Sequence, residues 1–95
     1  VIDNGLYGTI RMHQEREYPG RPHGSDIINP DFAAIARAYG MAGFTVRETE
    51  AFAPAFAAAL NSPKGALIHI VIDPEAITPT TTLSKIREAS LAAKM

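Results

Sequence analysis

The chain opens with Val1-Ile2-Asp3-Asn4-Gly5-Leu6-Tyr7-Gly8-Thr9-Ile10, a short apolar run that leads through Asn-Gly directly into a helical pattern. A strand, a turn that contains glycine and a helix N-terminus in this order can place an anion beside the first amides of the helix. We therefore expect an anion-binding or metal-binding turn at this point. Because the stretch begins inside a strand, we expect the chain to be the second half of a larger α/β domain.

Composition limits the classes of protein to consider. The chain has 95 residues, a formal net charge of -1 and no cysteine. The balanced charge gives no electrostatic reason to expect nucleic acid or an anionic membrane as a partner. The lack of cysteine excludes disulfides and thiolate metal sites and suits the reducing cytoplasm, where we expect the protein. No apolar run approaches the ~20 residues of a membrane-spanning helix, so we expect no membrane partner.

Strand and helix patterns alternate along the rest of the chain. Helices are predicted over 7–17, 29–39, from 49 or 50 to 60, and over 83–95. Strands are predicted over 43–47 and 66–72, and a loop rich in proline and glycine over 18–25. This order requires parallel pairing with right-handed crossovers. The run over 66–72 is nearly continuous in apolar residues, which is typical of a central strand covered on both faces. The fold class is therefore α/β, with an open parallel sheet.

Individual side chains follow from the same patterns. Asn29 is expected to cap the second helix, with Pro30 at its first position. His69 lies on an apolar strand and is expected to be a hydrogen-bonded structural residue. The predicted inward faces of the second and third helices are Phe32, Ile35, Ala36 and Tyr39, then Phe52, Ala55, Phe56, Ala59 and Leu60. A solvated helix face is predicted for Arg11, Glu15, Arg16 and Glu17.

Three segments carry a family resemblance: Asp3-Asn4-Gly5-Leu6-Tyr7-Gly8-Thr9-Ile10, then Asn29-Pro30-Asp31-Phe32 to Ala38-Tyr39-Gly40, and Asp73-Pro74-Glu75-Ala76-Ile77-Thr78-Pro79. Together they resemble the C-terminal end of a thiamine-diphosphate-dependent enzyme of the acetolactate synthase type. The resemblance implies that residues 1–95 are the C-terminal half of an open parallel-sheet thiamine-diphosphate-binding domain, with about three strands and flanking helices. It also implies a thiamine-diphosphate- and Mg²⁺-dependent lyase or carboligase, a homo-oligomer that acts on a small 2-oxo acid.

The resemblance assigns the site residues. In that family an upstream Gly-Asp-Gly sequence and an Asn hold the Mg²⁺ that bridges the cofactor diphosphate. Asn4 corresponds to this Asn and Leu6 would add its main-chain carbonyl, and oxygen ligands of this kind suit Mg²⁺. The expected cofactor-binding residues are Asn4, Gly5, Leu6, Tyr7 and Gly8, and the two glycines allow close approach of the backbone. Ile10 and His13 would lie at the substrate pocket.

The match to the family pattern is incomplete. The Gly-Asp-Gly half of the metal site is absent from these residues, as is the separate domain that supplies the Glu activating the cofactor ring. We therefore expect no catalytic residue in this chain, and we expect the chain to be inactive by itself.

Other interpretations of the same residues stay open. Asn-Gly is the strongest short signal for a hairpin turn, although the helical segment after it does not return as a strand. Ala36, Gly40 and Val46 have the spacing of a helix-turn-helix, but Glu48 and Glu50 follow immediately and disfavour contact with DNA phosphates. A non-catalytic α/β oligomerisation module is the third possibility, because a short open sheet has edges that can pair with another chain.

Overall fold

Strands β1 (Ile2–Asp3), β2 (Ala42–Val46) and β3 (Ala66–Val71) form one parallel sheet in the order β1-β3-β2. Ile70 of β3 lies opposite Ile2 on one side and opposite Val46 on the other. The apolar run that was predicted to be the central strand is β3, and it lies at the centre of the sheet. The fold class is confirmed as α/β with an open, three-stranded parallel sheet.

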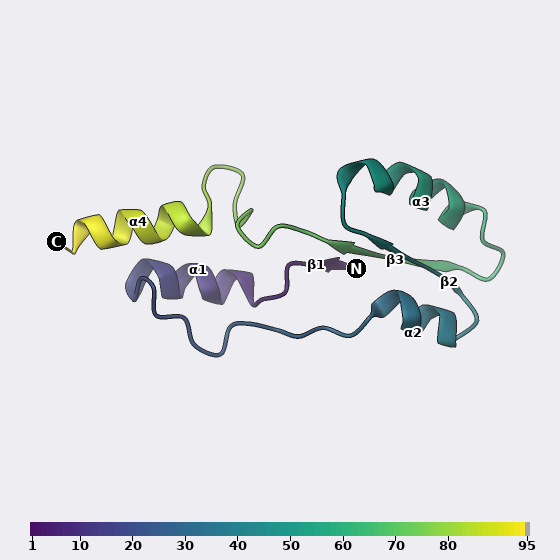
Figure 1. Ribbon diagram of the computed structural model, residues 1–95, viewed down its shortest axis with the longest axis horizontal. Helices are drawn as coiled ribbons and strands as arrows, with labels where there is room; N and C mark the ends of the chain where they lie inside the picture. Colours follow the sequence, from purple (N-terminus) through teal and green to yellow (C-terminus); the bar gives the residue numbers. More distant parts are fainter. Residues whose placement is uncertain (95) are drawn as a thin grey trace. The chain divides into compact units, whose positions relative to one another are not determined.

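The computed structural model describes residues 1–94, which divide into two compact units. The sheet unit joins residues 1–3 to 29–72, and the helix-pair unit joins 4–28 to 73–94. In the sheet unit, α2 (Phe32–Ala38) and α3 (Phe52–Leu60) lie on opposite faces of the sheet (Figure 1). A short 3-10 turn, η1 (Thr49–Ala51), leads into α3. Each strand of this unit is thus connected to the next through a helix, as the sequence predicts.

The start of α2 differs from the prediction. Asp31 is the N-cap, and its carboxylate accepts a hydrogen bond from the Ala34 N–H at 3.0 Å. Asn29, the expected cap, instead donates its side-chain amide to Asp3 Oδ1 at 2.7 Å. The residue before a proline is disfavoured in the helical region, so Asn29 stays extended before Pro30 and the helix begins later.

Helix α2 packs through small residues. Ala33 and Ala36 are 0% and 3% exposed, whereas Ile35 and Tyr39 of the predicted inward face are 42% and 83% exposed. The predicted face was therefore wrong for these two residues. The physical reason is a close approach to β2, because a Cβ at Gly43 would lie 2.2 Å from the Ala33 carbonyl oxygen. A helix can approach a strand this closely only where both have small side chains at the contact, here Ala33 and Gly43.

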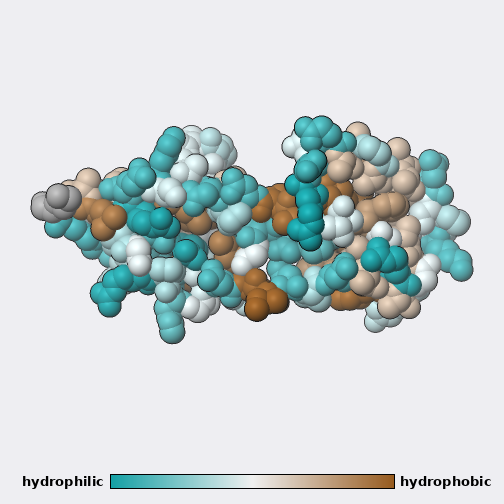
Figure 2. All heavy atoms as spheres, viewed as in Figure 1, coloured by the Kyte–Doolittle hydropathy of each residue, from teal (hydrophilic) through white to brown (hydrophobic). Residues whose placement is uncertain are grey.

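Helix α3 also presents an unexpected face. Phe52, Phe56 and Leu60, predicted inward, are 41%, 47% and 71% exposed, while Ala55 and Ala59 are half-buried. The two phenylalanine rings stack on one another with their centroids 5.6 Å apart. Hydrophobic residues accordingly show at the surface over α3 (Figure 2). A sheet of three strands is too narrow to cover the whole apolar surface of a helix that consists almost entirely of alanine, phenylalanine and leucine.

Two helices organise the other unit. Helices α1 (Gly8–Glu17) and α4 (Leu83–Ala93) lie side by side and run in the same direction (Figure 1). Thr82 caps α4 by accepting a hydrogen bond from the Lys85 N–H at 3.2 Å. The helix predicted over 83–95 ends at Ala93, and Met95 lies outside the described residues. Both helices are otherwise where the sequence pattern predicts them.

A buried carboxylate joins the two helices. Glu15 of α1 is 0% exposed, so its prediction as part of a solvated face was wrong. Arg87 of α4 donates to it through Nε at 2.6 Å and through Nη2 at 3.2 Å. Arg11 Nε and the Gly20 N–H donate to the same carboxylate at 3.2 and 3.1 Å. A period-3.6 pattern cannot reveal this burial, because the partner Arg87 is distant in sequence.

These donors hold Glu15 in its ionised form. The side-chain hydrogen bond from Arg87 is the largest cause that lowers the pKa of Glu15 to about 2, and the Gly20 amide and Arg11 add to it. Hydrogen bonds to a charged carboxylate favour that form and here outweigh the opposing effect of burial. The same contact raises the pKa of Arg87. The pair is therefore fully charged throughout the physiological range.

Two expectations about partners can be compared with these elements. Val46 lies on β2, not in a helix, so the helix-turn-helix interpretation was wrong. None of the helices within residues 1–94 has both the length and the apolar character needed to cross a membrane.

We predict that Glu15 makes the stability of the chain depend on acid pH. Because its folded-state pKa is lowered, its contribution is complete above the unfolded pKa of about 4.5 and is lost as the pH falls toward 2. A shift of this size corresponds to at most about 3 kcal/mol. Urea unfolding between pH 6 and pH 2.5 should show a smaller loss of stability on acidification for Glu15→Gln than for the wild type.

The matched control for this experiment is Glu17→Gln, which changes an exposed carboxylate two residues along the same helix. It should keep the pH dependence of the wild type. Equal pH dependence in the Glu15 and Glu17 variants would contradict the prediction.

Candidate functional site

The turn that follows β1 is closed by the side chain of Asn4. Its Oδ1 accepts a hydrogen bond from the Leu6 N–H at 3.2 Å, which makes an Asx-type turn. Gly5 between them has a φ of 73°, a conformation that a residue with a side chain rarely adopts. The Asn-Gly pair therefore shapes a turn into α1 rather than a hairpin. An amide oxygen has two lone pairs, so Asn4 Oδ1 keeps one acceptor position beyond this bond.

A second segment of the chain holds this turn from the side. The Ile27 N–H donates to the Gly5 carbonyl and the Tyr7 N–H donates to the Ser25 carbonyl, both at 2.8 Å. These bonds flank an isolated antiparallel bridge between Leu6 and residue 26. The backbone of Leu6 is thus fixed on both sides. The sequence did not predict this pairing, because the loop over 18–25 carries no strand pattern.

The N-terminus of α1 is open to an anion. The first helical bond runs from the Arg11 N–H to the Tyr7 carbonyl at 2.8 Å, so the N–H groups of Gly8, Thr9 and Ile10 precede it. The helix has no side-chain cap and no acidic residue in its first turn. Among residues 1–94 no acceptor is seen for these three helical amides, and together with the positive end of the helix dipole they favour a negative group at this position.

Gly8 lets the backbone pass close to Asn4. A Cβ at this position would lie 3.0 Å from Asn4 Nδ2 and 3.0 Å from Ile77 Cδ1. Any larger residue would therefore push the Asn4 side chain away from its place over the turn. Gly8 therefore has a steric reason to be glycine that is separate from the expected approach of its backbone to a diphosphate.

The remaining predicted site residues lie further along the same helix. Ile10 is 54% exposed and His13, one turn later, is also exposed. Both are available to a ligand or to another part of a larger protein. Asn4, Gly5, Leu6 and Tyr7 lie in the segment between β1 and α1 and Gly8 begins α1, whereas Ile10 and His13 lie on the adjoining helix surface.

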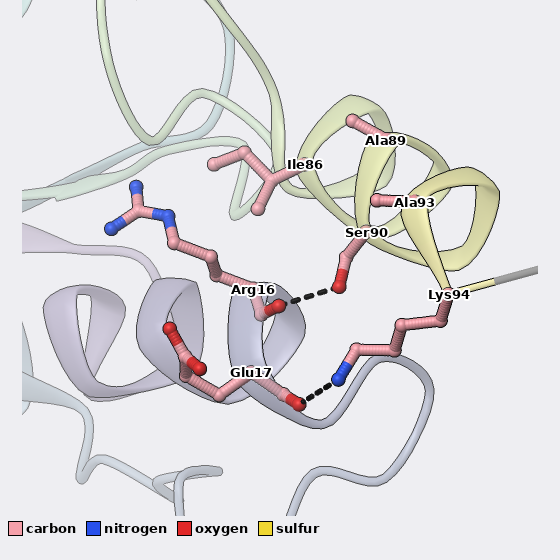
Figure 3. A pocket seen from close by; sticks show the side chains of 7 residues that line it. All are labelled: Arg16, Glu17, Ile86, Ala89, Ser90, Ala93 and Lys94. Atoms are coloured by element: carbon pink, nitrogen blue, oxygen red, sulfur yellow. Dashed lines mark hydrogen bonds between the residues drawn. The ribbon is translucent and has the colours of Figure 1, made fainter.

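A hollow between α1 and α4 lies at the other end of α1 (Figure 3). Ser90 Oγ donates to the Arg16 carbonyl, and Lys94 Nζ donates to the Glu17 carbonyl at 2.8 Å. These bonds satisfy carbonyl groups that end the helix without intrahelical partners. The hollow is thus a place where α4 caps α1, and it is separated from Asn4 by the length of the helix.

The oxygen atoms of the turn fit one part of a magnesium site. Asn4 Oδ1 and a main-chain carbonyl such as that of Leu6 are hard, neutral ligands of the kind that Mg²⁺ accepts. Within residues 1–94, no group of three or more histidine, aspartate or glutamate side chains could hold a metal ion. Two neutral oxygens would not retain Mg²⁺ by themselves, so a complete site needs additional anionic ligands.

The sheet unit contains a polar cluster that sequence reasoning found only in part. His69 was predicted to be a hydrogen-bonded structural residue, and this is confirmed: it is 6% exposed and its Nε2 lies 2.7 Å from Asp3 Oδ2. Asn29 donates to the other oxygen of Asp3 at 2.7 Å. The ring of Phe32 packs edge-on against His69 with centroids 5.1 Å apart. Only the parallel pairing of β1 with β3 brings Asp3 and His69 together.

Comparison with known proteins shows the family to which the chain belongs. Residues 1–70 match the model of the family described as thiamine pyrophosphate enzyme, C-terminal TPP binding domain. The chain is 36% identical over 72 residues to the acetolactate synthase large subunit of Parasynechococcus marenigrum (strain WH8102), an alignment that covers 74% of this chain and 12% of the relative. It is 32% identical over 72 residues to the catabolic acetolactate synthase of Raoultella terrigena, covering 76% of this chain and 12% of that relative.

The chain thus spans about an eighth of the length of the curated relatives that it matches. The match includes both the Asn4 turn and the parallel sheet. This chain belongs to the thiamine pyrophosphate enzyme family, as part of its C-terminal TPP-binding domain, and its relatives include acetolactate synthases.

Proposed function

We propose that this chain is the part of a thiamine-diphosphate- and Mg²⁺-dependent lyase or carboligase that closes the metal site. In this proposal Asn4 contributes its side-chain oxygen and Leu6 its carbonyl to Mg²⁺. The remaining anionic ligands come from a Gly-Asp-Gly sequence elsewhere in the enzyme and from the diphosphate itself. The observation that carries the proposal is the Asn4 turn, closed over an uncapped helix N-terminus.

The chain's own residues would then have two tasks. Gly8, Thr9 and Ile10 direct their N–H groups toward the diphosphate, where the absence of acidic residues in the first turn avoids repulsion. The turn at Gly5 holds the Asn4 side chain in place through the hydrogen bond from the Leu6 N–H to Asn4 Oδ1. Thiamine diphosphate, when bound, supplies the electron sink for cleavage or formation of a bond next to the carbonyl of a 2-oxo acid. Protein groups elsewhere would activate its ring.

We further propose that Ile10 and His13 contribute to the substrate pocket of the intact enzyme, which acts in the cytoplasm on a small 2-oxo acid. Their exposure on α1, at positions that follow the diphosphate-binding end, supports this assignment. The acetolactate synthase relatives support the reaction class.

A second candidate function is association with another copy. The stacked Phe52 and Phe56 and the neighbouring Leu60 are exposed on α3, and β2 has an unpaired edge in the described sheet. Exposed apolar surface and open strand edges favour association. We propose that the enzyme is a homo-oligomer, and that the isolated chain self-associates without catalytic activity.

Replacement of Asn4 by Ala in the natural full-length protein that carries this sequence should weaken Mg²⁺ and cofactor binding together, by at least about 10-fold, because one oxygen ligand is lost. Asn4→Asp should retain binding, since it keeps an oxygen at the same position. Titration calorimetry with thiamine diphosphate and Mg²⁺ measures both affinities. Thermal unfolding without cofactor should change little.

Asn61→Ala is the control for this experiment. Asn61 lies in the sheet unit and its side chain donates to the Ala57 carbonyl at 3.1 Å. It should leave cofactor affinity unchanged. Cofactor affinity in Asn4→Ala equal to that of the wild type would refute the assignment of Asn4 as a ligand.

The substrate-pocket assignment can be tested separately. His13→Ala should change the turnover or the preference among 2-oxo acids while cofactor affinity stays within about twofold, because His13 lies beyond the diphosphate-binding turn. His23→Ala removes an exposed histidine of the loop and serves as the control. Steady-state kinetics with two 2-oxo acids of different size are the measurement. Identical substrate preference in wild type and His13→Ala would count against the assignment.

The isolated 95-residue chain should not bind thiamine diphosphate at micromolar concentration, because no group of three or more histidine, aspartate or glutamate side chains among its described residues could hold the metal ion. It should also form dimers or larger species as its concentration rises. Calorimetric titration and light scattering over a concentration series test the two statements. A monomer that binds the cofactor with micromolar affinity would overturn both.

A further inference from the structure

The side chain of Arg11 connects the buried carboxylate of Glu15 to Asp26, which pairs with Leu6 of the candidate metal site. Arg11 lies on α1 between Glu15 and Asp26 and is only 16% exposed. Its Nε donates to Glu15 Oε1 at 3.2 Å and its Nη1 donates to Asp26 Oδ1 at 3.0 Å. A guanidinium group can serve two carboxylates at once because its donors point in fixed directions in one plane.

Glu15 limits where Arg11 can lie. The carboxylate is fully buried and receives two hydrogen bonds from Arg87 and one from the Gly20 N–H. These contacts leave the Glu15 oxygens no freedom to follow a moving partner. The hydrogen bond from Arg11 Nε to Glu15 therefore sets the orientation of the Arg11 guanidinium group. Its Nη1 then binds Asp26.

Asp26 stands at the centre of the segment that holds the metal-binding turn. It forms the isolated bridge with Leu6. Two main-chain hydrogen bonds flank that bridge, one from the Ile27 N–H to the Gly5 carbonyl and one from the Tyr7 N–H to the Ser25 carbonyl. The Asp26 side chain itself is 84% exposed, and among the described residues its carboxylate is held by Arg11. A displacement of Asp26 would therefore be transmitted to the main-chain hydrogen bonds of Gly5 and Tyr7, on either side of Leu6.

We propose that Arg11 is a positioning residue for the metal site, linking the buried Glu15 to Asp26 and so holding the backbone that fixes the Leu6 carbonyl. This inference rests on the proposed function, because the orientation of the Leu6 carbonyl affects binding only if that carbonyl is a ligand. Neither Arg11 nor Asp26 contacts the metal or the cofactor in this account. Their effect passes through main-chain hydrogen bonds.

The test compares Arg11→Met with Arg16→Met in the natural full-length protein that carries this sequence. Both variants remove a guanidinium group from α1 and keep an aliphatic side chain, but Arg16 is exposed and lies outside the link. Amide hydrogen exchange without ligands should become faster at Tyr7 and Ile27 in Arg11→Met only. Calorimetry with thiamine diphosphate present should show Mg²⁺ bound about 10-fold more weakly in the same variant, the low end of the effect of outer partners on a metal site.

Asp26→Asn tests the other half of the link without disturbing Glu15. It should reproduce both effects of Arg11→Met, and the double variant should be no worse than either single one, because all three break the same connection. Since Asp26 is a surface residue, this variant also serves if Arg11→Met fails to fold.

The outcomes separate this inference from the proposed function. Mg²⁺ affinity unchanged in Arg11→Met or in Asp26→Asn overturns the positioning role, whatever the exchange rates show. Effects of equal size in Arg16→Met would also overturn it, because they would reflect the loss of charge alone. A wild type that binds no Mg²⁺ with the cofactor would refute the proposed function, while faster exchange at Tyr7 and Ile27 in Arg11→Met would still show that the link exists.

Discussion

The ionised carboxylate of Glu15 is the constraint on which the helix-pair unit depends. A buried charge is stable only when donors surround it, and here Arg87, Arg11 and the Gly20 amide fill that need. Each donor comes from a different part of the chain: α4, α1 and the loop that follows α1. Satisfying one carboxylate therefore fixes two helices and a loop with respect to one another. Removal of any one donor would leave a costly group partly unpaired, so the arrangement is specific as well as stable.

Helix α1 has different tasks at its two ends. Its first turn lacks a side-chain cap and acidic residues, which leaves the N-terminal amides to an external anion. Its last turn is satisfied within the protein, because Ser90 and Lys94 of α4 donate to carbonyl groups of Arg16 and Glu17. A helix whose C-terminal end is anchored can present an open N-terminal end in a defined direction. This asymmetry suits the proposed role of the α1 N-terminus in binding a diphosphate.

In the sheet unit, helix α2 packs closely on strand β2 through small residues. Ala33 and Gly43 allow α2 and β2 to approach at backbone distance, and the polar cluster of Asp3, Asn29 and His69 adds directional bonds beside β3. The core is therefore small, and α3 keeps Phe52 and Phe56 at its surface. In a family whose matched relatives are about six times as long as this chain, such a surface is available to contacts with the rest of an enzyme or with a second copy.

The sequence by itself determined the order of elements, the parallel sheet and the turn at Asn4. Each of these depends on neighbours in the chain: the apolar run of β3, the glycine that permits the turn, and the helical spacing after it. The tertiary structure decided the burial of Glu15, the pairing of Leu6 with Asp26, the cap at Asp31 and the exposed face of α3. These depend on partners distant in sequence, such as Arg87 for Glu15, and on how much of a helix a narrow sheet can cover. A local pattern shows that a residue is charged or apolar, but only the folded chain shows which surface it meets.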